Sequence, residues 1–268
     1  MKTTKDQFVI ACLEKAADAA IVLSYARHCA RRLGKGLVVL SVAKEGTGDW
    51  IKQYGLPYIG LKGDWKTAVD GLPTVLGGVL AVTAVERSAP RSSIANPSTL
   101  LKTFADCKIA YLVVGDHCSA PNDQWPETTV LSLDHRRESK EKLIWGSYMV
   151  RFFGSRLTLA TPDYKDALFR EKLHNNILFT QKMYRSLGVD YSLKAIAVSG
   201  FTPPDLAIVD NCPPPYASHR MLISMTTDRR DRDLGDLLGG TTERKLLQRS
   251  SMPILFLNQR DDLYVLCD

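Results

Sequence analysis

Apolar and polar residues form blocks at the start of the chain, with the lengths of a strand, a helix and a second strand. The segment QFVIACLE, residues 7–14, is an apolar run of strand length that ends at the acid Glu14. In residues 15–36 apolar positions recur at helical spacing, the last turn is basic, and Gly34 supplies the left-handed stop. The apolar run LVVLSVA, residues 37–43, follows. This order predicts a βαβ unit, which requires parallel strands joined by a right-handed crossover.

The same order returns 120 residues further along the chain. From Thr128 an apolar strand pattern ends at Asp134, a helical pattern runs up to Gly154, and another strand pattern begins. The spacing from Glu14 to Gly34 equals the spacing from Asp134 to Gly154. A repeat of this length has the size of a domain and not of a solenoid unit. The sequence therefore predicts one domain copied once.

Both halves continue as alternating strands and helices, which favours an α/β fold with an open parallel sheet covered on both faces. We expect two tandem domains, each with a parallel five-stranded sheet. The segment DHCSAPNDQWPET, residues 116–128, is rich in proline and polar residues and has the composition of a linker. We therefore place the boundary near Ala120 and expect domains at residues 1–120 and 121–268.

Composition and charge exclude some classes of partner. The net charge is +6, with acids and bases interleaved, whereas a nucleic-acid-binding protein gathers positive charge into one dense stripe. We expect no nucleic-acid partner. The longest apolar stretch, residues 74–85, is too short to span a bilayer, and the run at residues 8–13 is too short for a signal-peptide core. These patterns predict a soluble cytoplasmic protein with no membrane partner.

Candidate chemistry is sparse in this sequence. The six cysteines are scattered without a C-x-x-C pair, which is typical of reduced, buried thiols and not of a metal site. The sequence contains no nucleophile elbow, no phosphate-binding G-x-x-x-x-G-K-[ST] loop, no H-E-x-x-H and no G-x-G-x-x-G after a strand. We expect no catalytic residues and no enzymatic activity.

Three features together resemble a tandem universal stress protein. They are the acid that closes the first strand of each half, the KGD turn at residues 62–64, and the segment LLGGTTERKLLQRSSMPILFL at residues 237–257. The resemblance covers nearly all of both halves. It implies two flavodoxin-like domains of the adenine nucleotide alpha hydrolase type and a role in stress response. In nucleotide-binding members of the family, the acid lies by the adenine of ATP. A G-x-x-G element, followed after nine residues by G-S or G-T, binds the phosphates and ribose.

The resemblance transfers to the second half only in part. The glycines of the upstream G-x-x-G element are replaced there by TTDR, residues 226–229. The residues that would hold a nucleotide in the second half are Asp134, Thr226, Arg229, Gly239, Gly240 and Thr241. In the first half the two elements have become ERSA, residues 86–89, and NPST, residues 96–99. We therefore expect the first half to have lost the phosphate cradle.

Two functions stay open at this point. In the first, the second half binds ATP or another adenine nucleotide, accompanied by Mg²⁺. The start of the helix after Gly240 presents unpaired amides, and nearby arginines supply forked donors. In the second, the chain is an interaction or scaffold protein of the same fold that binds no nucleotide. Residues 239–242 are then a plain helix start, and Asp134 only satisfies local backbone amides. Either a monomer whose halves pair within the chain or a homodimer fits both functions.

Overall fold

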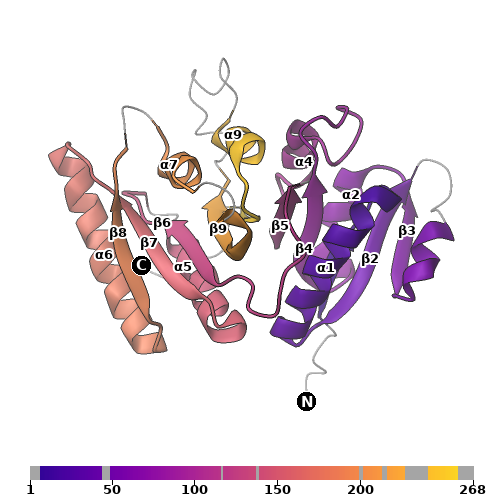
Figure 1. Cartoon of the computed structure of the whole chain (residues 1–268), viewed down its shortest axis with the longest axis horizontal. Helices are drawn as coiled ribbons and strands as arrows, with labels where there is room; N and C mark the ends of the chain where they lie inside the picture. Colours follow the sequence, from indigo (N-terminus) through magenta and orange to yellow (C-terminus); the bar gives the residue numbers. More distant parts are fainter. Residues whose placement is uncertain are drawn as a thin grey trace. The chain divides into compact units, whose positions relative to one another are not determined.

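The computed structural model describes residues 7–43, 49–115, 117–136, 139–198, 202–212, 216–226 and 241–258. The chain divides into two compact units, each of which is described by itself (Figure 1). Unit 1 is Met1–Ala120 with Asn258–Asp268, and unit 2 is Pro121–Leu257. The side-chain amide of Asn258 donates to the backbone oxygens of Phe104 at 2.6 Å and Cys107 at 2.7 Å, which explains its grouping with unit 1. The sequence analysis gave Asn258 to the second domain.

Unit 1 contains a sheet of five strands in the order β3-β2-β1-β4-β5, and each pair that the structure describes is parallel. The strands are β1 (Phe8–Cys12), β2 (Gly36–Ala43), β3 (Tyr58–Lys62), β4 (Gly78–Val85) and β5 (Ala110–Gly115). The helices are α1 (Ala16–Leu33), the 3₁₀ helix η1 (Asp49–Tyr54), α2 (Trp65–Asp70), α3 (Leu72–Val75) and α4 (Pro97–Thr103). Asp64 caps α2 and Asn96 caps α4, each through its side-chain oxygen.

Unit 2 repeats this topology with the order β8-β7-β6-β9-β10, again parallel throughout. Its strands are β6 (Thr128–Ser132), β7 (Arg156–Pro162), β8 (Tyr191–Ile196), β9 (Arg220–Met225) and β10 (Ile254–Leu257). Its helices are α5 (Ser139–Tyr148), the π-helical η2 (Met149–Phe153), α6 (Ala167–Leu187), α7 (Pro204–Asp210), the 3₁₀ helix η3 (Tyr216–His219) and α9 (Thr242–Arg249). Helix α5 packs against α6, and α7 packs against α9. Right-handed crossovers put these two pairs on opposite faces of the sheet.

The strand registers of the two units match at an offset of 120 residues. Phe8 of β1 stands opposite Gly36 of β2, and Thr128 of β6 stands opposite Arg156 of β7. The first helix of each unit also ends in the same way, since Gly34 has φ 62° and Gly154 has φ 70°. These are left-handed conformations that glycine adopts without the steric cost of a side chain. The predicted α/β fold class, with a parallel five-stranded sheet in each unit, is confirmed.

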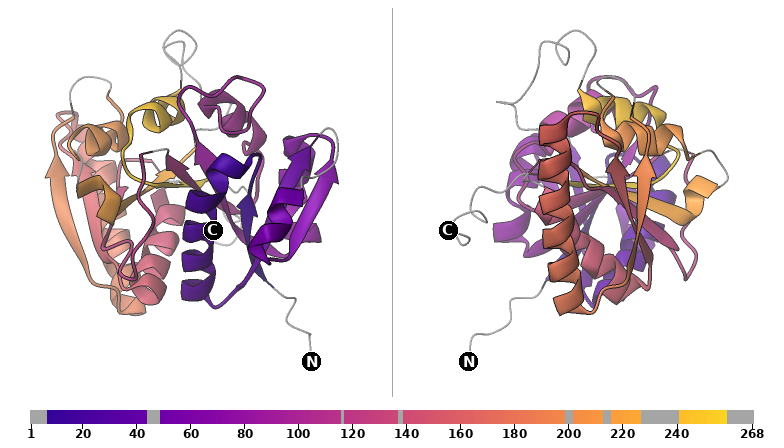
Figure 2. Two further views of the ribbon diagram at one scale, coloured as in Figure 1. Left: turned by 45° about the vertical axis from the view of Figure 1, so that its right-hand side comes forward. Right: turned by 90° about the vertical axis from the view of Figure 1, so that its left-hand side faces the viewer.

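The connection between the second and third strands differs most between the units. In unit 1 it contains the six-residue helix η1, and in unit 2 it contains the 21-residue helix α6. The sequence analysis assigned no element to the α6 segment. Figure 2 shows α6 running along the sheet of unit 2. Only Leu173, Thr180 and Tyr184 of this helix are buried, so most of its surface faces outward.

The core of each unit consists mainly of its first, fourth and fifth strands along the chain. Strands β4, β5, β6, β9 and β10 are almost wholly buried, as parallel strands covered on both faces must be. The outer strands β3 and β8 are largely exposed. Within the described ranges, none of the helices combines the length and the apolar character that a bilayer crossing requires.

Candidate functional site

In unit 1, the acid that follows the first strand binds the unit's own loop. Glu14 lies two residues beyond β1, and its carboxylate accepts hydrogen bonds from the hydroxyl of Ser93 and, at 3.2 Å, from the backbone N–H of Ile94. Ser93 and Ile94 lie on the loop after β4, which neighbours β1 in the sheet. The carboxyl ends of parallel neighbours meet at one edge, where ligands bind in this class of fold. The negatively charged Glu14 carboxylate therefore occupies hydrogen-bond donors at this edge of the sheet.

The rest of this loop is bonded within unit 1 as well. The side-chain oxygen of Asn96 accepts from the N–H groups of Ser98 at 3.0 Å and Thr99 at 3.4 Å, at the start of α4. Its amide nitrogen donates to the backbone oxygen of Ala89 at 2.7 Å. A helix start can bind phosphate through such amides, but here a side chain of the loop occupies them. The carboxyl edge of unit 1 is closed by its own polar groups.

In unit 2, the matching acid is bound by a nearby arginine. Asp134 lies two residues beyond β6 and is 1% exposed. Its Oδ2 accepts from the Nε of Arg136 at 2.9 Å and pairs with the Nη2 at 2.7 Å, while its Oδ1 accepts from the backbone N–H of Arg136 at 3.0 Å. Its backbone oxygen accepts from the amide of Asn176 on α6 at 2.7 Å. Asp134 thereby fixes the turn that follows β6.

Two cations keep Asp134 ionised. Burial by itself would raise the pKa of Asp134, but the charges of Lys142 and Arg136, together with the hydrogen bonds from Arg136, lower it to about 2. Lys142, on α5, is 2% exposed and donates to the hydroxyl of Ser132 at 2.9 Å. The Arg136 side chain is half exposed, so its guanidinium is anchored by Asp134 while a part of it faces outward.

Three aromatic rings gather beside Asp134. The Nδ1 of His135 lies 3.0 Å from the hydroxyl of Tyr164, just after β7. The His135 ring stacks on Phe169 of α6, with centroids 4.3 Å apart and planes inclined by 15°. Phe169 is 37% exposed. Burial, and then the charge of Asp134, raises the pKa of Tyr164 to about 12, so this hydroxyl stays protonated at neutral pH. We call His135, Tyr164 and Phe169 the aromatic cluster.

The other predicted site residues lie partly outside the described ranges. Thr226 directly follows β9, and its N–H donates to the backbone oxygen of Leu257 at 2.9 Å. Thr241 is the N-cap of α9, where its hydroxyl oxygen accepts from the N–H of Arg244 at 3.4 Å. Because α9 leads from β9 to β10, its start lies at the same carboxyl edge as Asp134 and Thr226. Arg229, Gly239 and Gly240 lie outside the described residues.

Sequence reasoning missed four members of this edge, namely Arg136, Tyr164, Phe169 and Asn176. Tyr164 and Phe169 stand around the start of α6, which the sequence analysis left without an element. A signal was present, because Asp166 followed by helical periodicity is typical of a capped helix start, and Asp166 does accept from the N–H of Phe169 at 3.1 Å. Among the described residues, no group of three or more His, Cys, Asp or Glu side chains could hold a metal ion.

Comparison with known proteins relates this chain to solved structures only. No family model matches the sequence, and no curated protein sequence matches it. A universal stress protein from Archaeoglobus fulgidus aligns with a TM-score of 0.62 and 13% identity, over 95% of this chain and 97% of that chain. A Pseudomonas aeruginosa protein assigned to the universal stress proteins has a TM-score of 0.59 and 13% identity, over 95% and 94% of the two chains.

A third similar structure is a cytoplasmic domain of a prokaryotic cation chloride cotransporter. It aligns with a TM-score of 0.56 and 12% identity, over 98% of this chain and 100% of that chain. At such low identity the comparisons show the fold alone. The chain has the fold of tandem universal stress proteins, and the resemblance inferred from the sequence is confirmed at that level.

The low pKa of Asp134 predicts a specific loss of stability in acid. Its folded pKa of about 2 lies below the unfolded value near 3.9, so its contribution is complete above about pH 5 and is lost as the pH falls toward 2. The expected loss is about 2 kcal/mol of unfolding free energy. Urea unfolding of the wild type and of Asp134→Asn between pH 6 and pH 2.5 measures it.

The free-energy difference between these two proteins should shrink by that amount as the pH falls. Asp163→Asn is the matched control, since Asp163 is an exposed acid just after β7. A difference between wild type and Asp134→Asn that stays constant with pH would contradict the ion pairing described for Asp134.

Proposed function

We propose that the chain is a stress-response protein that binds one adenine nucleotide, at the carboxyl edge of unit 2. The observation that carries this proposal is the aromatic cluster beside the ionised Asp134. The cluster offers an exposed Phe169 ring, already stacked on His135, at the place where the family's acid lies by the adenine. An adenine ring can stack on such a surface, because offset aromatic stacking combines apolar burial with favourable quadrupole geometry.

The polar groups around the cluster suit the rest of a nucleotide. Arg136 is charged and forked, and its pairing with Asp134 holds it at this edge. The start of α9 at Thr241 adds the positive end of the helix dipole, which favours phosphate, while the N–H of Arg244 already donates to the Thr241 hydroxyl. In this proposal Asp134 positions Arg136 and does not itself contact the ligand, since both of its oxygens already accept from Arg136. Mg²⁺ would accompany ATP through the phosphates.

In this proposal unit 1 binds no nucleotide. A nucleotide phosphate at its edge would have to displace the Glu14 carboxylate from Ser93 and Ile94. Displacement would leave a half-buried carboxylate without those donors and would place two negative charges close together. We therefore expect one nucleotide for each chain. The proposal includes no catalytic activity. The absence of enzymatic activity and the cytoplasmic location remain expectations from the sequence.

Titration calorimetry with ATP and Mg²⁺ tests this function. The wild type should bind one ATP per chain, and Phe169→Ala should weaken binding by about fivefold to a hundredfold, because stacking of a base on an aromatic side chain contributes about 1–3 kcal/mol. Phe152→Ala is the matched control, since Phe152 is 39% exposed and Phe169 is 37% exposed.

Flat traces up to millimolar ATP would remove the proposal. So would equal affinities of the two variants, which would separate binding from the aromatic cluster. A stoichiometry of two would contradict the closed edge of unit 1.

A second candidate is an interaction protein, and a row of exposed apolar side chains favours it. Ile144, Tyr148 and Phe152 are 42%, 40% and 39% exposed, and they follow at intervals of four residues along α5 and η2. Side chains at this spacing lie on one side of a helix. Large contiguous exposed apolar surface marks interaction sites. The similar cotransporter structure also supports this candidate. It is a cytoplasmic domain of a transporter, so the same fold occurs there as one part of a larger protein.

Light scattering after gel filtration tests self-association through this row. At high concentration the wild type should have the mass of a dimer, and Tyr148→Ser should shift it toward a monomer because the substitution removes the central apolar ring. Leu187→Ser, at an exposed leucine near the end of α6, controls for a general loss of surface apolarity. A monomeric wild type at every concentration would count against a homodimer formed through this row.

A further inference from the structure

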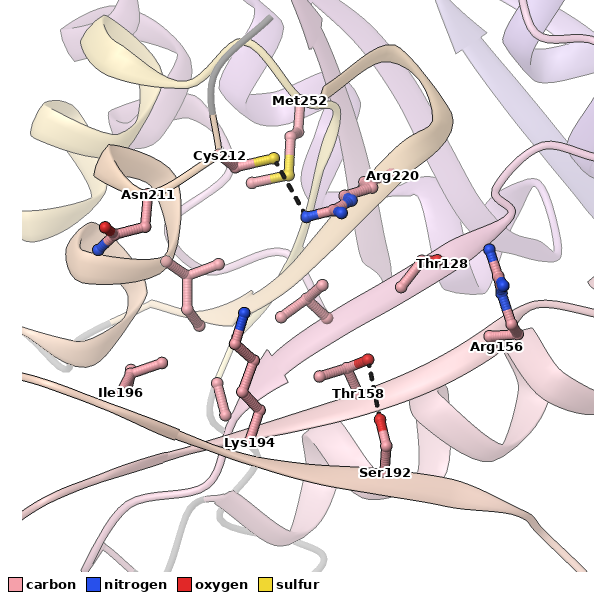
Figure 3. Close-up of a pocket in the computed structure, with 13 residues that line it drawn as sticks. Thr128, Arg156, Thr158, Ser192, Lys194, Ile196, Asn211, Cys212, Arg220 and Met252 are labelled. Atoms are coloured by element: carbon pink, nitrogen blue, oxygen red, sulfur yellow. Dashed lines mark hydrogen bonds between the residues drawn. The ribbon is translucent and has the colours of Figure 1, made fainter. Parts of the chain in front are cut away.

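Unit 2 contains a cavity that lies away from the carboxyl edge. It has a volume of about 390 Å³ and lies over the sheet on the face covered by α7 and α9 (Figure 3). Its floor is formed by alternate residues of β6, β7 and β8, including Thr128, Thr158 and Lys194. Ile208 of α7 and Met252, before β10, form an apolar wall. Asp134, Thr226 and Thr241, the described residues among those predicted from the stress-protein resemblance, do not line it.

Three cations line this cavity, and none of its described lining residues is a carboxylate. They are Arg156 at the start of β7, Lys194 on β8 and Arg220 at the start of β9. Within the described part of the chain, none of the three forms an ion pair, and the Nη1 of Arg220 lies 3.7 Å from the Sγ of Cys212. In Figure 3 the Lys194 ammonium and the Arg220 guanidinium both extend into the space above the strands. Like charges brought together in this way favour an anion between them.

Hydroxyl groups complete the polar side of the cavity. Thr158 and Ser192 lie side by side on β7 and β8, with their oxygens 3.2 Å apart, and Thr128 stands at the start of β6. Hydroxyls and backbone N–H groups can each donate, and guanidinium and ammonium groups can only donate. A ligand here must therefore be rich in acceptor oxygens.

Unit 1 provides an internal comparison, because the strand registers of the two units match. Phe8 pairs with Gly36 and Gly78 in unit 1, and Thr128 pairs with Arg156 and Arg220 in unit 2. Leu40 in unit 1 and Ala160 in unit 2 are equivalent positions, 120 residues apart. Leu40 pairs with Ile59 and Ala160 pairs with Lys194, so Ile59 and Lys194 are equivalent as well. The lining residues Thr128, Arg156, Thr158, Lys194 and Arg220 thus stand at the positions of Phe8, Gly36, Val38, Ile59 and Gly78.

The same positions in unit 1 hold apolar side chains or glycine. Val38 and Gly78 are buried, Phe8 and Ile59 are half-buried and Gly36 is exposed, while a Cβ on Gly36 would lie 2.5 Å from the Phe8 ring. Unit 1 therefore has no charged side chain at these five positions. Unit 2 instead replaces five apolar or glycine positions by two hydroxyls and three cations around an open volume. Arg156 and Lys194 are exposed, so these charged groups can reach a ligand from solvent.

We propose that this cavity binds a small organic phosphate, namely a phosphate monoester carried on a compact, partly apolar body such as a sugar ring. The dianionic phosphate group offers three acceptor oxygens to Lys194, Arg220 and the hydroxyls. A volume of about 390 Å³ equals that of roughly ten waters, more than a free phosphate ion fills, and it falls in the range of small-molecule sites. The wall of Ile208 and Met252 contacts the body of the ligand. This site is separate from the nucleotide site proposed above.

Calorimetry on the full chain tests the proposal, with ribose 5-phosphate, ribose and inorganic phosphate as probes. Ribose 5-phosphate should bind saturably, ribose should not bind, and inorganic phosphate should bind at least tenfold more weakly. Lys194→Gln and Arg220→Gln should each weaken ribose 5-phosphate binding by about tenfold or more, as expected for loss of a hydrogen bond to a charged group. Lys194→Arg should restore most of the affinity. Arg170→Gln, at an exposed arginine of α6, is the matched control with the same change of net charge.

Lys194 lies on an exposed strand, so Lys194→Gln should keep the wild-type melting temperature while it loses binding. Absence of ribose 5-phosphate binding at millimolar concentration would overturn the proposal. So would equal affinity for inorganic phosphate, or equal losses in Lys194→Gln and Arg170→Gln. Phe169→Ala should leave ribose 5-phosphate binding unchanged, so failure of this site is distinguishable from failure of the nucleotide site.

Discussion

One carboxylate in each unit organises the carboxyl edge of that unit through its hydrogen bonds. Glu14 and Asp134 stand at matching places, two residues beyond the first strand. A carboxylate in such a half-buried or buried position needs donors or cations, because removing a charge from water without them is costly. Glu14 finds donors across the edge, at Ser93 and Ile94. Asp134 finds them two residues away, at Arg136. In the proposed function, this difference separates the closed edge of unit 1 from the edge of unit 2 that accepts the nucleotide.

The different hydrogen-bond partners of Glu14 and Asp134 go together with other differences between the two units. Where Glu14 holds the loop after β4, N–H groups of that loop donate to its own backbone oxygens, and Asn96 caps α4. Where Asp134 bonds locally, His135 follows it in the turn after β6 and stacks on Phe169, near the start of α6. On the other face of unit 2, cations stand where unit 1 has apolar residues or glycine. The two units thus share one topology, while the groups that can meet a ligand gather in unit 2.

Much of the fold could be predicted from the sequence, because its signals are local and occur twice. Buried parallel strands form apolar runs in the sequence, and Gly34 and Gly154 mark helix ends, so the places of the ten strands along the chain and the 120-residue offset followed from pattern alone. The site could be predicted only in part. The contacts of Glu14 with Ser93 join residues 79 apart, and the cluster around Phe169 depends on α6, a helix with few buried positions. The cations of the cavity converge only through strand register, which a sequence does not reveal without the sheet.

The most direct test of the closed and open edges is a titration of the ¹⁵N-labelled chain with ATP, followed by NMR. The account predicts that the backbone amide signals of His135 and Phe169 shift with saturation, while the signal of Ile94, whose N–H already donates to Glu14, stays in place. Shifts at Ile94 that saturate with ATP, or an unchanged signal at Phe169, would contradict the account.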